Sequence, residues 1–136
     1  MDEIQAGLLQ VKLRHLKELQ DERASICDKY LKAIHNTHLI LPRVRESSTT
    51  VWHQFVIRSN KRSELIDYLD KNGIGTIVHY PIPPHLSEAY AYLGYRKGSY
   101  PITETYANEV LSIPLYNGMT EEEIDKVVKC LNQWET

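Results

Sequence analysis

The sequence predicts an α+β fold: a small, mainly antiparallel sheet covered by helices and preceded by a long N-terminal helix. Residues 3–35 contain no proline and carry a wide apolar stripe, which indicates the long helix. Residues 49–58 are rich in β-branched and aromatic side chains, which indicates a strand. A chain of 136 residues has a common size for one domain, so residues 1–136 are predicted to form a single domain.

The first helix is predicted over residues 3–35, with Asp2 as its N-cap and a bend in its second half. Its apolar positions cover more of the helical circumference than the stripe of about 100° that one buried face needs. The excess lies before Leu19. The helix either crosses the middle of a bulky domain or packs its first half on something outside this chain. The wide apolar surface before Leu19 favours the second alternative, so we expect self-association through this helix.

Short extended and helical stretches follow. Residues 39–41 form a short extended piece, and residues 49–58 form the strongest strand of the sequence. Residues 62–72 are an amphipathic helix that Gly73 ends, and residues 75–79 are a second strand. Strict alternation along residues 49–58 divides the strand between two faces, and the aromatic side chains are expected in the core. One predicted face consists of Val51, His53, Phe55 and Ile57, and the other consists of Trp52, Gln54 and Val56.

The last third of the chain is predicted to be mainly helical. Helices are expected over residues 85–93 and 102–111, followed by a short extended piece at residues 112–115. Residues 116–118 are a turn. Thr120 and Glu123 then have the spacing of a capping box, which predicts a final helix that runs to Trp134.

Composition excludes several classes of function. The net charge of −2 gives no electrostatic reason to expect nucleic acid or an anionic membrane as a partner. No apolar run is long enough for a transmembrane helix, and the charged N-terminus does not resemble a signal peptide. Cys27 and Cys130 are too few for a disulfide scaffold. A cytoplasmic location follows as the default expectation.

The segment from His79 to His85 is the most distinctive part of the sequence. Its X-Pro-X-Pro-Pro run cannot continue a helix or a central strand, so it is predicted to be stiff and extended. Two imidazoles and the phenol of Tyr80 on such a segment are suited to bind a polar ligand. The alternative is a rigid connector whose aromatic side chains pack on their own domain. No third ligand near the two histidines has the spacing of a zinc site, and no nucleophile motif or glycine-rich phosphate loop is present, so no catalytic, cofactor-binding or metal residue is predicted.

Four blocks of the sequence resemble a known family and occur in its order: DEIQAGLLQVKL at residues 2–13, HYPIPPHL at 79–86, AYAYLGY at 89–95 and LSIPLY at 111–116. They are similar to the C-terminal region of the PLP-dependent sugar aminotransferases of the DegT/DnrJ/EryC1/StrS family. The resemblance extends from Asp2 to about Leu131. It implies the fold of the small C-terminal domain of fold-type I PLP transferases.

The resemblance also implies a function. In this family the lysine that binds PLP lies in a larger N-terminal domain, which this chain does not contain. We therefore expect the chain alone to bind no PLP and to be inactive. The segment that matches His79 and Tyr80 approaches a nucleotide-linked keto sugar at a dimer interface, and the amino donor is usually glutamate. The resemblance thus makes His79, Tyr80 and His85 the expected substrate-binding residues.

The sequence HYPIPPH resembles most the members that act on dTDP-linked 3-keto-6-deoxyhexoses. Amination at C4, and a dehydratase in which a histidine replaces the lysine, are the alternatives within the family. Outside catalysis, the chain as given has two further alternatives. One is a stand-alone module that binds sugar nucleotides, and the other is an interaction module that self-associates through its first helix.

Overall fold

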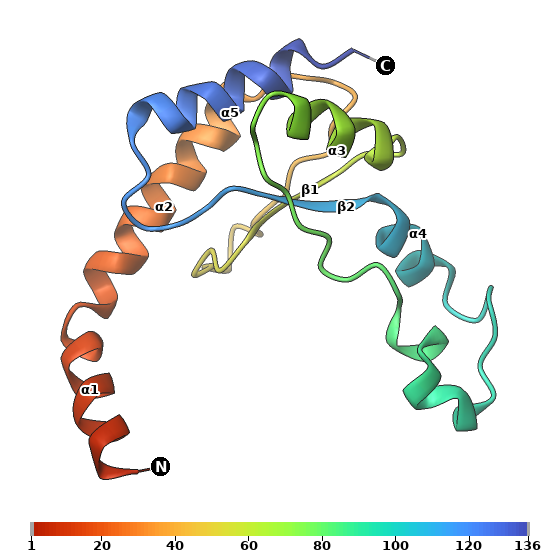
Figure 1. The fold of residues 1–136 in the computed structure, drawn as a ribbon, viewed down its shortest axis with the longest axis horizontal. Coiled ribbons are helices and arrows are strands. Elements are labelled where there is room, and N and C mark those ends of the chain that lie inside the picture. Colours follow the sequence, from red (N-terminus) through yellow and green to blue (C-terminus); the bar gives the residue numbers. More distant parts are fainter. Residues whose placement is uncertain (1, 136) are drawn as a thin grey trace.

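The computed structural model describes residues 2–135 and confirms the α+β class with a small antiparallel sheet (Figure 1). The elements in chain order are α1 (Glu3–Arg14), α2 (Leu16–Ala33), β1 (Phe55–Arg58), α3 (Arg62–Lys71), the 3-10 helices η1 (Pro84–Leu86) and η2 (Glu88–Leu93), α4 (Pro101–Glu109), β2 (Val110–Ile113) and α5 (Glu121–Gln133). Helices α2, α3 and α5 lie on one side of the sheet, while α1 and the 3-10 helices extend to opposite ends of the molecule.

The two strands pair antiparallel and divide their side chains between a core face and an outer face. The core-face pairs are Phe55 with Ile113 and Ile57 with Leu111, and all four side chains are buried. The other two pairs, Val56 with Ser112 and Arg58 with Val110, alternate with them and lie on the outer face.

Burial of apolar side chains from the three covering helices stabilises the domain. Tyr30 of α2 packs edge-on against Phe55 with ring centroids 5.2 Å apart, and its hydroxyl donates to the carbonyl oxygen of Pro114 at 2.9 Å. Leu65 of α3 and Leu131 of α5 are completely buried in the same cluster. Each such side chain contributes roughly 1.5–3 kcal/mol relative to an exposed position.

The predicted strand at residues 49–58 begins only at Phe55. The reason is Trp52, whose φ of +46° is not an extended conformation and breaks the alternation. Its indole turns into the core and stacks on Phe55 at 5.5 Å, whereas Val51 is exposed. Alternation therefore assigned Val51 to the wrong face, but the aromatic pair is in the core as expected.

The other two extended pieces flank the sheet without becoming full strands. Ile40 pairs with Arg58 on one edge, and Ile77 pairs with Ser112 on the other, each through a single bridge. The predicted strand at residues 75–79 is therefore reduced to one position. It still sets the path of the chain into the proline segment.

Only the second half of β2 was predicted as extended, since residues 112 and 113 belong to the expected extended piece at residues 112–115. The predicted helix at residues 102–111 ends at Glu109, and Val110 and Leu111 belong to the strand instead. Both side chains also fit a helical period, so periodicity could not separate the two states; pairing with β1 decides the outcome. The predicted helix at residues 85–93 consists of two 3-10 helices, with hydrogen bonds such as Leu86 N to Pro83 O at 2.9 Å.

The first helix is interrupted at His15, in its first half and not in its second half as predicted. No residue of α1 is buried. The exposed apolar side chains of this region are Ile4, Leu8, Leu9, Val11, Leu13, Leu16 and Leu19. Within residues 2–135, no helix has the length and apolar character needed to cross a membrane.

Two predicted helix ends match the structure. Gly73 has φ +69°, its N–H donates to Asp70 O, and the next N–H, of Ile74, donates to Leu69 O, which is a Schellman ending of α3. At the start of α5, Glu123 N donates to Thr120 Oγ1 and Thr120 N donates to Glu123 Oε2, which completes the capping box.

Candidate functional site

The candidate site is built where the chain leaves the edge of the sheet at Ile77. Two backbone hydrogen bonds fix this point: Ile77 N donates to Ser112 O at 3.1 Å, and Ser112 N donates to Ile77 O at 2.8 Å. Two residues later the ring of His79 lies beside the same strand, with Nδ1 at 2.9 Å from Ser112 Oγ. The central strand β2 therefore positions both the main chain and the imidazole.

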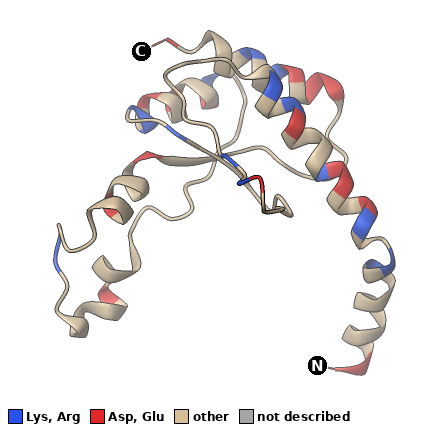
Figure 2. Cartoon of the chain, turned by 180° about the vertical axis from the view of Figure 1, so that it is seen from behind, with Lys and Arg blue, Asp and Glu red and all other residues tan. Residues whose placement is uncertain are grey.

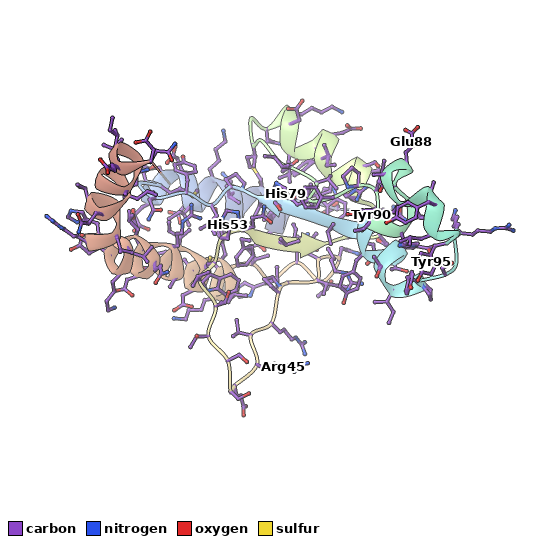
Figure 3. All side chains as sticks on the ribbon, turned by 90° about the horizontal axis from the view of Figure 1, so that it is seen from below. Arg45, His53, His79, Glu88, Tyr90 and Tyr95 are labelled. Carbon is purple, nitrogen blue, oxygen red and sulfur yellow. The ribbon has the colours of Figure 1, made fainter. Side chains whose placement is uncertain are left out.

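His79 lines two small cavities. One has a volume of about 180 Å³ and is lined by polar groups from three segments, among them His53, Gln54 and Thr76. The other has a volume of about 230 Å³ and lies toward the proline segment, with Tyr80 and Tyr106 on its walls. Figure 3 shows His53 and His79 over the middle of the molecule, whereas Tyr90 and Tyr95 lie at the end formed by the 3-10 helices.

Tyr80 stands next to His79 and is largely exposed. Its ring is nearly perpendicular to the imidazole, with centroids 5.6 Å apart, and 74% of its surface is accessible. The peptide bond between the two residues is cis. The structure thus brings two of the three predicted binding residues together, with polar groups available to a ligand from solvent.

The third predicted residue, His85, is engaged inside the domain. Its Nε2 is 3.0 Å from Glu104 Oε1, and its ring packs edge-on against Tyr100 at 4.9 Å. Only 8% of its side chain is exposed. Glu104 also accepts hydrogen bonds from the backbone N–H groups of Gly98 and Tyr100. The bonds from Gly98 first, and from His85 next, lower the pKa of the Glu104 carboxyl.

A second group of polar contacts lies on the outer face of the sheet. The guanidinium of Arg58 forms two hydrogen bonds to Glu109 Oε2, at 2.6 and 3.0 Å, and stacks 4.0 Å above the ring of Tyr106. The sequence predicted Arg58 only as part of a strand. These contacts connect β1 to the end of α4, next to the second cavity of His79.

Known proteins resemble this arrangement over nearly the whole chain. Residues 1–132 match the profile of the DegT/DnrJ/EryC1/StrS aminotransferase family. The chain belongs to this family. A dTDP-3-amino-3,6-dideoxy-alpha-D-galactopyranose transaminase of Aneurinibacillus thermoaerophilus is 38% identical over 98% of this chain. The crystal structure of DesV from S. venezuelae, in complex with a ketimine intermediate, superimposes with a TM-score of 0.95 at 35% identity and also covers 98% of this chain.

A third DegT/DnrJ/EryC1/StrS relative bears on the cofactor. The putative sugar aminotransferase Spr1654 from Streptococcus pneumoniae, solved in a PLP form, matches 97% of this chain and 35% of its own, with a TM-score of 0.86 at 25% identity. The present chain spans about 36% of the length of the transaminase and of DesV.

The residues of this family member around His79 do not fit PLP. PLP enzymes of this kind require a lysine for a Schiff base and donors for the phosphate. The described residues that line the two cavities beside His79 include neither lysine nor arginine. Among residues 2–135, no group of three potential metal ligands is present either.

Ser112 was missed as a site residue. In this DegT/DnrJ/EryC1/StrS family member it lies on β2, next to an imidazole that is 33 residues earlier in the chain. The sequence places Ser112 inside the block LSIPLY, where it reads only as a short extended piece. A polar residue between apolar neighbours in a strand was the available signal, because alternation places it on the face opposite the core.

Proposed function

We propose that this chain is the substrate-side small domain of a PLP-dependent nucleotide-sugar aminotransferase. The reaction moves an amino group from glutamate to C3 of a dTDP-linked 3-keto-6-deoxyhexose. The observation that carries the proposal is the pairing of His79 and Tyr80 at two open cavities in a member of a sugar aminotransferase family. Both side chains present a polar atom on a rigid ring, which suits them to hydrogen-bond the hydroxyls or carbonyl of a hexose.

The hexose is a better match for this segment than the diphosphate. Residues 72–95 carry no lysine or arginine and a single acidic residue, Glu88, so the stretch around His79 is almost without charge (Figure 2). A diphosphate is bound most strongly by cationic donors. His79 and Tyr80 therefore contact the neutral sugar, and the phosphates are bound elsewhere in the enzyme.

The choice of a dTDP nucleotide and of C3 as the aminated position is inferred from the relatives. The transaminase from A. thermoaerophilus is named for a dTDP-linked 3-amino-6-deoxy sugar and matches nearly all of this chain. His85 remains a predicted ligand contact. Because its Nε2 is engaged with Glu104, a bond to the sugar would have to use Nδ1.

Calorimetry with a dTDP-linked hexose tests this assignment. Saturable binding that weakens in His79→Ala and in Tyr80→Phe supports it, and each lost hydrogen bond is expected to weaken binding about fivefold. His35→Ala is the matched control, because His35 is exposed and lies beyond the end of α2. Binding that is equal in all four proteins contradicts the role of His79 and Tyr80.

Catalysis is proposed to require a PLP-binding domain outside residues 1–136. The purified chain soaked with PLP should show no Schiff-base absorbance and no transamination. A Schiff-base band that disappears when one lysine is replaced would contradict this part of the proposal and leave the sugar contacts untouched.

The exposed apolar surface of α1 favours a second candidate function. No residue of this helix is buried, although it carries five large apolar side chains. A surface of this kind is typical of an interface. The candidate is a module that self-associates through α1 as part of a homo-oligomer, with or without sugar binding.

A further inference from the structure

Ser112 lies behind His79 at the centre of the candidate site. Only 7% of its surface is exposed, and its side chain lies on the outer face of β2. Its backbone holds Ile77 through two hydrogen bonds, and its hydroxyl oxygen is 2.9 Å from His79 Nδ1. One residue therefore fixes the main chain just before the imidazole and one nitrogen of the imidazole itself.

This contact determines where the imidazole carries its proton. A neutral imidazole has one N–H donor and one bare nitrogen acceptor. Within residues 2–135, His79 Nδ1 is the only hydrogen-bond partner of the Ser112 hydroxyl. A buried hydroxyl proton without an acceptor is unfavourable. The geometry therefore favours the hydroxyl as the donor to Nδ1, with the ring proton on Nε2.

We propose that Ser112 is a positioning residue that holds neutral His79 as the Nε2–H tautomer and presents that N–H to the substrate. The inference rests on the proposed function, in which His79 contacts the hexose. It specifies that contact: His79 donates a hydrogen bond to an oxygen of the sugar, and in this state it does not accept a proton from it. An oxygen acceptor such as a carbonyl or a hydroxyl is the matching ligand group.

The position of the imidazole against β2 explains why Nε2 is the nitrogen that meets a ligand. Nδ1 is covered by β2, so Nε2 is the only ring nitrogen left for a ligand. The ring cannot rotate about its bond to Cβ without losing the Ser112 contact. The Ser112 hydroxyl thus determines that Nε2 is the donor and in which direction its N–H points.

Nitrogen-15 NMR of the imidazole tests the tautomer directly, without any ligand. The 136-residue chain labelled at histidine is measured at about pH 8, above the ordinary range in which histidine titrates. His79 is expected to show the Nε2–H pattern. A Nδ1–H pattern or an even mixture in the unaltered chain overturns the proposal, and this reading needs no variant to fold.

Three variants show whether Ser112 is the cause. Ser112→Ala should turn the His79 signal into a mixture of tautomers, and Ser112→Thr, which keeps a hydroxyl, should restore the Nε2–H pattern. Ser59→Ala is the matched control: this serine is also buried, at 2% exposure, but its hydroxyl accepts from Lys61 N and does not contact His79. A backbone amide spectrum of each variant checks the fold. An unchanged His79 pattern in a folded Ser112→Ala chain overturns the proposal.

Titration with a dTDP-linked hexose separates this inference from the proposed function. Ser112→Ala should bind about fivefold more weakly than the unaltered chain, and Ser112→Thr should recover most of the affinity. If the tautomer changes as expected but His79→Ala binds the sugar as tightly as the unaltered chain, the sugar contact of the proposed function fails and the positioning role of Ser112 stands. If His79→Ala weakens binding but Ser112→Ala changes neither the tautomer nor the affinity, the positioning role of Ser112 fails and the sugar contact of His79 stands.

Discussion

The carboxylate of Glu104 connects His85 to the loop before α4. His85 Nε2 lies 3.0 Å from Glu104 Oε1, and Gly98 N and Tyr100 N donate to the same carboxylate at distances of 2.8–3.2 Å. The exposed fractions of the two side chains are 8% and 12%. One acidic side chain thus ties the first 3-10 helix to residues 98–100, and it fixes the end of the molecule that extends beyond the site.

Replacement of this carboxylate should loosen that end locally. In Glu104→Ala the amides of Gly98 and Tyr100 lose their acceptor, so their hydrogen exchange should become faster. The amides of α5, which belong to the core, should keep their protection. Hydrogen exchange followed by NMR measures both regions in one experiment. Equal protection of Gly98 and Tyr100 in both proteins would show that the carboxylate does not hold the loop.

Acid should destabilise the domain through three carboxylates. The pKa values of Glu22, Glu104 and Glu123 are all lowered from the ordinary 4.5, and the largest cause in each case is a hydrogen bond: from the Asn117 side chain, Gly98 N and Thr120 N, respectively. A lowered folded-state pKa adds stability that is present above the unfolded-state value and is lost as the pH falls through the folded-state value. The urea midpoint should therefore be flat from pH 7 to about 5 and fall below about pH 4.5.

A single variant isolates one of the three contributions. Glu123→Gln removes one charged carboxylate of the α5 capping box but keeps a side chain that can still accept from Thr120 N. Its urea midpoint should depend less on pH in the acidic range than that of the unaltered chain. An identical pH profile would show that Glu123 contributes nothing to acid sensitivity.

The glycine after α3 should be needed for its backbone conformation. Gly73→Ala should destabilise the domain by about 1 kcal/mol, because φ is +69° there and a Cβ disfavours that conformation. The new Cβ would meet only Lys126 Nζ, at 3.4 Å, and that side chain can move. Gly75→Ala is the control, because a Cβ there meets nothing within 4 Å. Chemical denaturation should find the control unchanged within about 0.5 kcal/mol.

Truncation of an apolar side chain should cost much stability in the core and almost none in α1. Leu65→Ala should lower the free energy of unfolding by about 2–5 kcal/mol, since its side chain is completely buried. Leu8→Ala should change it by less than about 0.5 kcal/mol, since 67% of this residue is exposed. A similar loss in both variants would mean that α1 is packed against the domain in solution.

Self-association, if α1 mediates it, should be sensitive to charge on that helix. Leu13→Asp places a carboxylate on a residue that is 65% exposed and should shift the protein toward monomer in analytical ultracentrifugation. Leu93→Asp makes the same change on η2, at the opposite end, and should leave the association unchanged. A monodisperse monomer of the unaltered chain at high concentration would count against the interface.

The sequence predicted best those elements whose signals are local. The capping box of Thr120 and the glycine ending of α3 depend on a few neighbouring residues, and both are present in the structure. β2 depends instead on a partner strand more than 50 residues earlier. Its apolar residues continued the helical pattern of α4, so the pairing could not be inferred from the local sequence.

The same distinction applies to the candidate site. His79 and Tyr80 are sequence neighbours on a proline-stiffened segment, so their proximity was implied by the sequence. The contact with Ser112 follows from the bridge between Ile77 and Ser112, which no local pattern encodes. The engagement of His85 with Glu104 likewise depends on the path of the intervening loop.

The pairing of α2 with α5 has a consequence for synthesis on the ribosome. Asn132 Nδ2 donates to Ala33 O across 99 residues, and Asn36 binds the carbonyl oxygens of Leu131 and Trp134. A nascent chain therefore cannot pack α2 against α5 until residues 121–133 have left the exit tunnel. α5 is made after every other described element, so this contact forms late in the folding of the domain, when the sheet and α3 are already available.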